Sequence, residues 1–510
     1  MKKIYITCVC MAATLFTSCS DFLNVTPKDK VLEPDQFKTE DGINTALNGL
    51  YRQLVDKDLY GGNLSQTTLE AMGHYYTYSS TKPASADLET DIWFLANGNY
   101  TDYESVTNLF ANVWKTGYKT LFNINNFLKG VEESKAIIDA NSKNNIMGEA
   151  YGLRAYLHFD LFRLFGPRYE ERSATDKILP YNNTSDPVLN HTGYEDDVYS
   201  TADTYLQLLQ DDIRKAEDLL STDPILSQPM AITDTLQNNY YLNRNRRMNY
   251  YAVKGLEARV LQYMGRLPEA ATVAKEVTDQ LGSSNDKKKA FRWIDPTSVN
   301  SKRNYTFFRE VVFGIETMEM SSNYSSYYEQ SDLRKGYAVD LNNLTQNIFP
   351  EQNFEASTDV RTKQWVLGEA SSNTATYSPA GTYISKKFKA TSSDLPAIKN
   401  LQPLLRMSEM FYIQAEAALA AGDKDKAIEI LSSIAEHRGL SPQYYPTKDS
   451  DFAAYIEREY YKEFYGEGQI YFFHKRRGDA KMYKGNNVGT EDVNTAKAYT
   501  VAIPKDETDI

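Results

Sequence analysis

The sequence has few cysteines and histidines, which argues against several kinds of chemical site. Among its 510 residues, three cysteines lie within the first 19 positions and five histidines are spread from 74 to 474. No C-x-x-C, H-E-x-x-H, G-x-S-x-G or G-x-x-x-x-G-K motif occurs. The signatures of a redox dithiol, a zinc protease, a hydrolase nucleophile and a phosphate-binding loop are therefore missing. We expect no enzyme, no cofactor and no metal centre, with a bound calcium ion left open.

Positive charge and long apolar segments are also scarce. Lysine and arginine number 56 against 68 aspartates and glutamates, which gives a net charge of −12. An acidic chain repels phosphate backbones, so we expect no nucleic acid partner. No segment after residue 16 approaches the roughly 20 apolar residues of a membrane-spanning helix. A composition of 41% hydrophobic and 24% charged residues is typical of a globular chain.

The first 18 residues indicate a secretory signal peptide. Residues 1–3 are basic, and residues 4–16 are apolar but too short to cross a bilayer. Cys19 follows, and a chain that starts there has a single thiol, so no internal disulfide is expected. Its position after the apolar stretch predicts that Cys19 is the acylated residue of a lipoprotein. Phe16 departs from the branched apolar residue usual three places before such a cysteine, and an ordinary signal peptide is the alternative.

Residues 404–440 predict two amphipathic helices joined by a tight turn. Gly422 supplies the positive φ that ends the first helix, Asp423 or Asp425 can cap the second, and Gly439 ends it. The spacing Ala415-x6-Gly422-x4-Ala427 occurs again as Ala258-x6-Gly265-x4-Ala270. Small residues at these positions let two helices approach closely. A tetratricopeptide-like (TPR-like) unit is therefore predicted twice, far apart in the chain.

The remaining apolar periodicity predicts a mainly α-helical fold. Outside residues 404–440, helical spacing is found in segments 41–57, 106–131, 146–165, 202–220, 250–265, 268–281 and 452–466. Residues 287–401 depart from this pattern, with β-like runs at 310–315 and 380–388 between polar loops. We expect an N-terminal part (19–286) and a C-terminal part (287–510) in one compact unit. TPR-like helix pairs form its scaffold, with large irregular loop insertions and a few short β-strands.

In their order along the chain, these segments resemble the SusD/RagB family of Bacteroidetes outer-membrane lipoproteins. The resemblance covers nearly the whole sequence and lies in a series of short matches: Cys19, Phe22, Leu23 and Pro27; Gly49 and Tyr51; Trp114, Tyr118, Ile124, Asn125 and Asn126; Gly148, Glu149 and Ala150; Leu153, Arg154 and Ala155; Phe165 and Gly166; the repeat at 258–270; Arg406, Ala415, Glu416 and Ala417; Arg438 and Gly439; and Glu463, Glu467 and Gly468. Asn24, Ile470 and Phe473 depart from the residues common in the family, which suggests a divergent branch.

The resemblance implies a role in nutrient capture. Members of the family act as surface lids on a SusC-like TonB-dependent transporter and bind glycans, or peptides in the RagB branch, without catalysis. By resemblance, this chain is a lipid-anchored, surface-facing protein of the outer membrane that captures an oligosaccharide and delivers it to such a transporter. Peptide capture is the alternative, and a glycoside hydrolase or a pure TPR scaffold is less favoured.

Two loop-like segments rich in aromatic residues, 61–99 and 321–332, are the candidate ligand site. Sugar rings stack on exposed aromatic rings while their hydroxyls bond to Asn, Asp and Tyr groups. The resembled family commonly builds its site from these two places. The predicted ligand-binding residues are Trp93, Asn97, Tyr76, Tyr324, Tyr327 and Tyr328. The alternative for each ring is that it fills space within a packed loop.

Two charged groups have competing interpretations. Asp87, Glu89 and Asp91 lie close to Trp93 and could suggest the carboxylate pair of a glycosidase, but solvated loop charges are favoured. The basic cluster at 475–477 could contact phospholipid headgroups. Contact with a partner or plain solvation is favoured there, because a lipid anchor already holds the protein.

Overall fold

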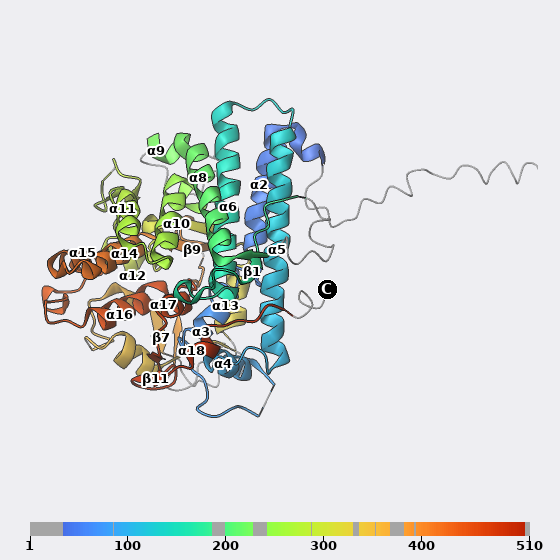
Figure 1. Cartoon of the computed structure of the whole chain (residues 1–510). Helices are drawn as coiled ribbons and strands as arrows, with labels where there is room; N and C mark the ends of the chain where they lie inside the picture. The colour runs from blue at the N-terminus through green and yellow to red at the C-terminus, as the bar shows by residue number, and fades with distance from the viewer. Residues whose placement is uncertain are drawn as a thin grey trace, which may run out of the picture.

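The computed structural model describes residues 34–84, 86–185, 199–227, 242–286, 288–329, 336–351, 353–367, 382–391 and 394–504. Helices dominate and strands are short, which confirms the predicted mainly α fold (Figure 1). None of the described helices is both long and apolar enough to span a membrane. The predicted signal peptide and Cys19 lie outside the described residues.

The elements have the following bounds. The longer helices are α2 (Glu40–Leu54), α5 (Glu104–Glu133), α6 (Ala140–Phe165), α8 (Ala202–Leu219), α10 (Tyr250–Tyr263), α11 (Leu267–Thr278), α14 (Met407–Ala420), α15 (Lys424–His437) and α16 (Phe452–Phe464). The shorter helices are α3 (Thr68–Met72), α4 (Leu88–Ala96), α9 (Pro224–Ser227), α12 (Val299–Lys302), α13 (Met320–Tyr328), α17 (Ile470–Arg477) and α18 (Thr495–Ala498). The strands are β1 (Lys177–Pro180), β2 (Tyr199–Thr201), β3 (Leu281–Gly282), β4 (Phe291–Arg292), β5 (Val311–Glu316), β6 (Val339–Asp340), β7 (Trp365–Leu367), β8 (Thr382–Ser385), β9 (Leu401–Arg406), β10 (Lys481–Tyr483) and β11 (Thr490–Asp492).

The strands form small sheets that join distant parts of the chain. β5 pairs antiparallel with β9, and Val311 lies opposite Arg406 at the end of this ladder. β8 lies between β6 and β7, and the other strands form the pairs β1–β2, β3–β4 and β10–β11. Because α14 begins at the residue after β9, the β5–β9 pair fixes where the C-terminal TPR-like unit starts.

The two longest helices, α5 and α6, run side by side along one edge of the molecule (Figure 1). α6 is capped by Asp139, whose carboxylate accepts a hydrogen bond from the Ser142 backbone N–H at 3.0 Å. A Cβ added at Gly117 of α5 would lie 3.1 Å from the Leu161 side chain of α6. The missing side chain at Gly117 therefore allows the two helices to pack closely.

The two TPR-like units stack on one another although they are far apart in the sequence. α10 packs on α11, α14 packs on α15, and α11 packs on α14. Gly265 and Gly422 have φ angles of +71° and +80° at the turns inside the two pairs. Asp423 caps α15 by accepting a hydrogen bond from the Lys426 backbone N–H at 2.9 Å. The predicted turn chemistry is thus confirmed.

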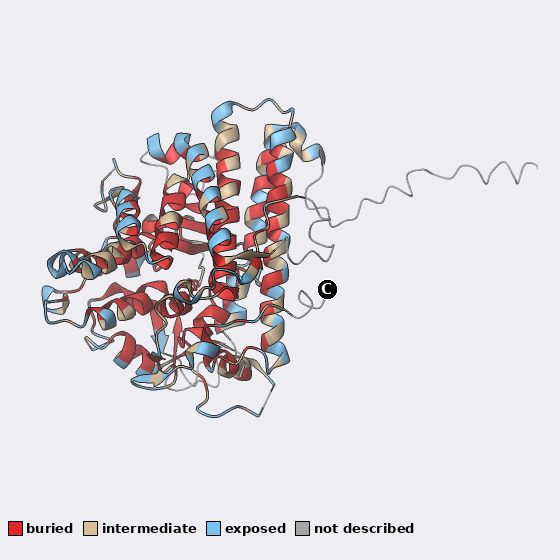
Figure 2. Cartoon of the chain, viewed as in Figure 1, coloured by how far each residue is buried: buried red, intermediate tan, exposed pale blue. Residues whose placement is uncertain are grey.

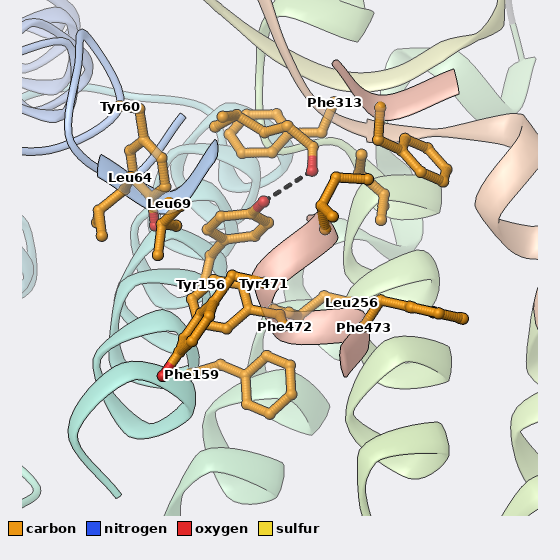
Figure 3. Close-up of a cluster of buried hydrophobic side chains, with 14 of the residues drawn as sticks. Tyr60, Leu64, Leu69, Tyr156, Phe159, Leu256, Phe313, Tyr471, Phe472 and Phe473 are labelled. Carbon is orange, nitrogen blue, oxygen red and sulfur yellow. Dashed lines mark hydrogen bonds between the residues drawn. The ribbon is translucent and has the colours of Figure 1, made fainter. Parts of the chain in front are cut away.

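One large hydrophobic cluster runs through the molecule and takes residues from Ile43 to Val501. A second, small cluster is made of Ile294, Val299, Tyr305, Phe307 and Val360. Figure 2 shows buried residues along the inner faces of the helices. Figure 3 shows part of this core, where Phe159 of α6, Leu256 of α10 and Phe472 of α17 come together. Residues on both sides of position 287 contribute to the cluster, while the boundary at 287 itself stays a prediction.

The C-terminal part also buries a network of paired charges around Glu463 of α16. Its carboxylate lies 2.5 Å from Arg438 Nε, 2.8 Å from Arg406 Nη2 and 3.0 Å from Arg361 Nη1, and none of these side chains is more than 1% exposed. Burial alone would raise the pKa of Glu463, but the three guanidinium groups hold it well below its ordinary value. A buried charge requires such compensation. The network therefore ties β9, α15 and α16 together.

Candidate functional site

The predicted loop at 61–99 is in fact built from turns, α3 and α4, and the last turn of α4 bears Trp93. α4 ends at Asn97, whose side-chain amide donates to the Trp93 carbonyl at 2.7 Å. Gly98 follows with a φ of +62°, and a Cβ there would lie 2.9 Å from the backbone of Ala498. This close approach fixes the end of α4 against α18. Trp93 is half-buried with its ring edge-to-face on Phe94, and Asn97 is exposed.

The predicted loop at 321–332 forms helix α13 as far as Tyr328. Met320, Tyr324 and Tyr328 are buried at successive i+4 positions. This buried stripe explains why a serine-rich segment is helical, because tertiary packing outweighs low intrinsic helix propensity. The expectation of a loop is therefore wrong for residues 321–328.

Tyr327 lies on another side of α13 and is half-buried. Its hydroxyl donates to the Gly61 carbonyl at 3.1 Å, and the Asn323 side chain donates to the same oxygen at 3.2 Å. A Cβ on Gly62 would lie 2.8 Å from the Tyr327 hydroxyl. The missing side chain at Gly62 thus leaves room for Tyr327, whose ring is held in place by its hydroxyl.

Three of the six predicted ligand-binding residues are buried in the core. Tyr76, Tyr324 and Tyr328 are 0%, 4% and 1% exposed. Tyr324 donates to the Ser385 carbonyl at 2.8 Å, and the hydroxyls of Tyr76 and Tyr328 both bond to the Gln66 carbonyl. The expected exposure of these three rings is wrong, because backbone carbonyls inside the core satisfy their hydroxyls. The three tyrosines are therefore part of the packed core and not exposed stacking residues.

Asp91 of α4 links the two segments. The pKa of Tyr103 is raised by burial and then by the charges of Asp91 and Asp87. The pKa of Tyr337 is raised by burial, then by Tyr327, then by Asp91. The rings of Tyr337 and Tyr327 meet edge-to-face with centroids 6.2 Å apart. We use the name α4–α13 surface for the predicted ligand-binding residues of these two segments that reach solvent, which are Trp93, Asn97 and Tyr327.

Sequence reasoning did not identify two tyrosines that pack against α4 and α13. Tyr337 stands alone in a stretch with no periodic pattern, so no signal in the sequence points to it. Tyr103 lies just ahead of α5 and stacks on Phe94 with centroids 4.7 Å apart and planes 7° apart. It directly follows the Asn99–Asp102 hydrogen-bonded turn, and its stacking on Phe94 is visible only in the fold.

Carboxylates surround this surface. Burial, followed by Asp58 and Asp56, raises the pKa of Tyr327 to about 12, so its hydroxyl is neutral at physiological pH. Asp87 and Asp91 lie at the N-terminus of α4, where negative charge is favourable. Each has a buried carboxylate oxygen without a hydrogen-bond partner among the described residues. Asp87 and Asp91 are therefore helix N-terminal charges and not the solvated loop charges that were favoured.

One group of side chains has the connectivity of a catalytic relay. His474 Nδ1 lies 2.9 Å from Asp479 Oδ2, and His474 Nε2 lies 3.1 Å from the Tyr461 hydroxyl. Tyr461 and His474 are fully buried, and Tyr461 donates to the Gly73 carbonyl at 2.7 Å. A substrate cannot reach that hydroxyl in this arrangement, so the relay connects α16 and α17 structurally. Across the described residues, no group of three or more His, Cys, Asp or Glu side chains could hold a metal ion.

The basic cluster at 475–477 is directed into the fold. Lys475 is 1% exposed, and its ammonium donates to the carbonyls of Leu164 and Gly166, both at 2.9 Å. Burial lowers the pKa of Lys475 to about 7. Arg476 pairs with Glu416 and Arg477 pairs with Asp479. The prediction that these side chains are simply solvated is therefore wrong. Lys475 donates to carbonyl groups at the C-terminal end of α6, and both arginines pair with carboxylates.

Comparison with known proteins identifies the family. A family model described as "Starch-binding associating with outer membrane" matches residues 21–231, and the model of the SusD family matches residues 230–509, which is more than half of the chain. The SusD-like protein P38 of Formosa agariphila is 24% identical over 255 residues, which cover 48% of this chain and 43% of that protein. The SusD-like protein P25 of the same organism is 23% identical over 201 residues, 36% of this chain and 34% of that protein. The chain thus aligns with less than half the length of these curated relatives.

Solved structures share the fold over most of the chain. A SusD superfamily protein from Bacteroides thetaiotaomicron is 20% identical, with a TM-score of 0.69 and coverage of 92% of this chain and 98% of that chain. A SusD-like carbohydrate binding protein from Bacteroides vulgatus is 16% identical, with a TM-score of 0.64 and coverage of 92% and 96%. A laminarin binding SusD-like protein is 16% identical, with a TM-score of 0.62 and coverage of 92% and 97%. These structures show the shared fold, and the SusD family model over more than half of the chain shows that the chain belongs to the SusD family.

Proposed function

We propose that this chain is a lipid-anchored, surface-facing protein of the outer membrane that captures an oligosaccharide without cleaving it. It then passes the sugar to a SusC-like TonB-dependent transporter. The observation that carries the proposal is the α4–α13 surface, where the half-buried rings of Trp93 and Tyr327 and the exposed amide of Asn97 remain available. The starch-binding description of one matching family model and the laminarin binding of one similarly folded protein support a glycan ligand.

The chemistry of the α4–α13 surface suits a sugar. Flat aromatic rings offer stacking faces for the C–H sides of a pyranose, and the side-chain amide of Asn97 offers a polar contact to its hydroxyls. Tyr327 rests on Tyr337 and Tyr328, and its hydroxyl is fixed on Gly61. A ring that is already fixed loses little conformational entropy when a ligand binds, which favours affinity.

The direct test is calorimetric titration of the chain lacking residues 1–19 with laminarin and starch oligosaccharides. We expect Trp93→Ala and Tyr327→Ala each to weaken binding on the order of tenfold, since a stacked ring contributes about 1.4 kcal/mol or more. Tyr327→Phe keeps the ring but loses the hydrogen bond to Gly61, so it should bind less tightly than wild type and more tightly than Tyr327→Ala. Tyr444→Ala, outside this surface, is the matched control.

The sugar recovered after incubation should be intact, because the proposed function is non-catalytic. Shortened sugar would refute that part of the proposal. Unchanged affinity in both alanine variants would show that the glycan binds elsewhere on the protein. Failure to bind any glycan, together with peptides co-purifying in mass spectra, would favour the peptide-capturing role of the RagB branch.

A further inference from the structure

A hollow lies where the C-terminal ends of α6, α10 and α17 meet. None of its lining residues belongs to the α4–α13 surface. Its outer part measures about 560 Å³, within the range of roughly 300–1,000 Å³ typical of small-molecule sites. Its inner part is about 20 Å³, which is room for one water molecule or one hydroxyl group. Gln262, Tyr263 and Arg476 line both parts, so the two parts adjoin at these three side chains.

The positive charge around this hollow has a structural origin. Three helix C-termini converge here, and each carries partial negative charge that basic side chains neutralise. The guanidinium groups that line the hollow are themselves balanced by carboxylates: Arg172 pairs with Asp203 at 2.6 Å, Arg476 with Glu416 at 2.9 Å and Arg477 with Asp479 at 3.1 Å. The hollow is therefore close to neutral, and an anionic ligand is not required.

The inner part contains polar groups whose hydrogen bonds are incomplete. Tyr460 is 4% exposed, and its hydroxyl bonds to no residue that the structure describes. Gln262 is also 4% exposed; its amide nitrogen donates to Glu416 at 3.0 Å, and its carbonyl oxygen has no partner within the described chain. Arg476 uses one Nη on Glu416 and leaves its other N–H groups without a described acceptor. None of these atoms is among the enclosed side-chain atoms without a partner in the described residues, so they reach the hollow, where a ligand would complete their hydrogen bonds.

The walls of the hollow are aromatic. Phe159 of α6 and Phe472 and Phe473 of α17 line the inner part, and Figure 3 labels all three. Tyr263 stands edge-to-face on Phe159 with centroids 5.6 Å apart, and Tyr169 lies at the outer rim. Aromatic walls around mixed donors and acceptors match a hydroxyl-bearing ring, because a hydroxyl both donates and accepts.

We propose that this hollow is a second ligand site that takes a small uncharged saccharide, one or two sugar rings in size. One sugar hydroxyl occupies the inner part and bonds to Tyr460, Gln262 and Arg476. The ring then lies in the outer part between Tyr263 and Tyr169. This site goes beyond glycan capture at the α4–α13 surface and does not depend on that surface.

The test uses glucose and laminaribiose as probes in calorimetric titrations and crystal soaks of the chain lacking residues 1–19. The chain carries Trp93→Ala and Tyr327→Ala, so that binding at the α4–α13 surface does not contribute. We expect sugar density in the hollow and a 5- to 10-fold loss of affinity on adding Tyr460→Phe, the effect of one lost hydrogen bond. Tyr169→Ala at the rim should also weaken binding, and Tyr444→Ala is the control that should not.

Two results would overturn this second site. The first is density for an ordered water alone in the inner part at saturating probe concentration. The second is sugar binding that is unchanged by both Tyr460→Phe and Tyr169→Ala. The two sites are tested with different variants. Loss of oligosaccharide capture in the Trp93→Ala and Tyr327→Ala chain therefore does not decide whether a sugar binds in the hollow.

Discussion

Replacing Glu70 by glutamine should change how the stability of this protein depends on pH. Glu70 lies on α3 and is fully buried. Its Oε1 accepts a hydrogen bond from the Gly468 backbone N–H at 2.9 Å, and its Oε2 has no partner among the described residues. Burial raises the pKa of Glu70 to about 8, despite the opposing effects of the Gly468 hydrogen bond and the Lys387 charge. The native protein therefore keeps this proton at neutral pH.

The magnitude follows from proton linkage. Between its ordinary pKa of 4.5 and about 8, the unfolded chain releases the proton while the native protein retains it, so stability falls as pH rises. The contribution is fully present below pH 4.5 and is lost as pH passes the native pKa. Each tenfold change in proton affinity is worth about 1.4 kcal/mol. Glu70→Gln cannot ionise, so it should match wild type near pH 4.5 and exceed it by roughly 4 kcal/mol at pH 8.

The assay is urea unfolding of both proteins, followed by circular dichroism at several pH values from 4.5 to 8. Only the difference between the two curves matters, because other groups titrate equally in both proteins. Glu132→Gln on the exposed face of α5 is the matched control, and its curve should run parallel to wild type. If the Glu70→Gln curve also runs parallel, Glu70 is ionised in the native state and the reasoning fails.

Two further predictions concern packing and buried charge. Glu463→Gln removes the negative charge that compensates the guanidinium groups of Arg438, Arg406 and Arg361, and it should lower the unfolding free energy by about 3–5 kcal/mol. Glu429→Gln, at an exposed position, is its control. A loss below about 1 kcal/mol for Glu463→Gln would contradict the network's role. Gly49→Ala in α2 meets nothing within 4 Å and should stabilise by about 0.5–1 kcal/mol. Gly255→Ala in α10 would place a Cβ 2.3 Å from Leu405 and should destabilise by about 1–3 kcal/mol. Thermal or urea unfolding measures both, and equal signs for the two alanine variants would refute the packing argument.

The helices of the scaffold could be predicted because their signals are local. α5, α6, α8, α10, α11 and α16 lie where apolar residues recur at helical spacing, and the turns at Gly265 and Gly422 have the expected positive φ. The stacking of α11 on α14 was not predictable in this way. No residue pattern specifies which distant helix covers an apolar face.

Four of the charged residues that carried the family resemblance have a shared physical role. Arg406, Arg438, Glu463 and Glu467 lie in one buried network, where Arg406 Nε contacts Glu467 at 2.9 Å. In sequence they are separate short matches. Their mutual compensation appears only when β9, α15 and α16 are brought together.

Of the six predicted ligand-binding residues, the structure decides which ones reach solvent. Trp93, Asn97 and Tyr327 lie at the α4–α13 surface, and their contact with a ligand stays a prediction. Tyr76, Tyr324 and Tyr328 were misplaced because tyrosine has an apolar ring and a polar hydroxyl, so composition does not distinguish an exposed platform from a buried cluster. The backbone carbonyls of Gln66 and Ser385 that accept their hydroxyls come from distant segments.

The sequence by itself determined the helical class, the repeated TPR-like turn and the likeness to one family, because periodicity, glycine positions and capping residues act over a few neighbours. Only the tertiary structure decided which tyrosines face solvent, which charges are compensated in the core and where α6, α10 and α17 leave a hollow. Burial and hydrogen-bond partnership are properties of groups brought together from distant parts of the chain, and no local pattern of residues encodes them.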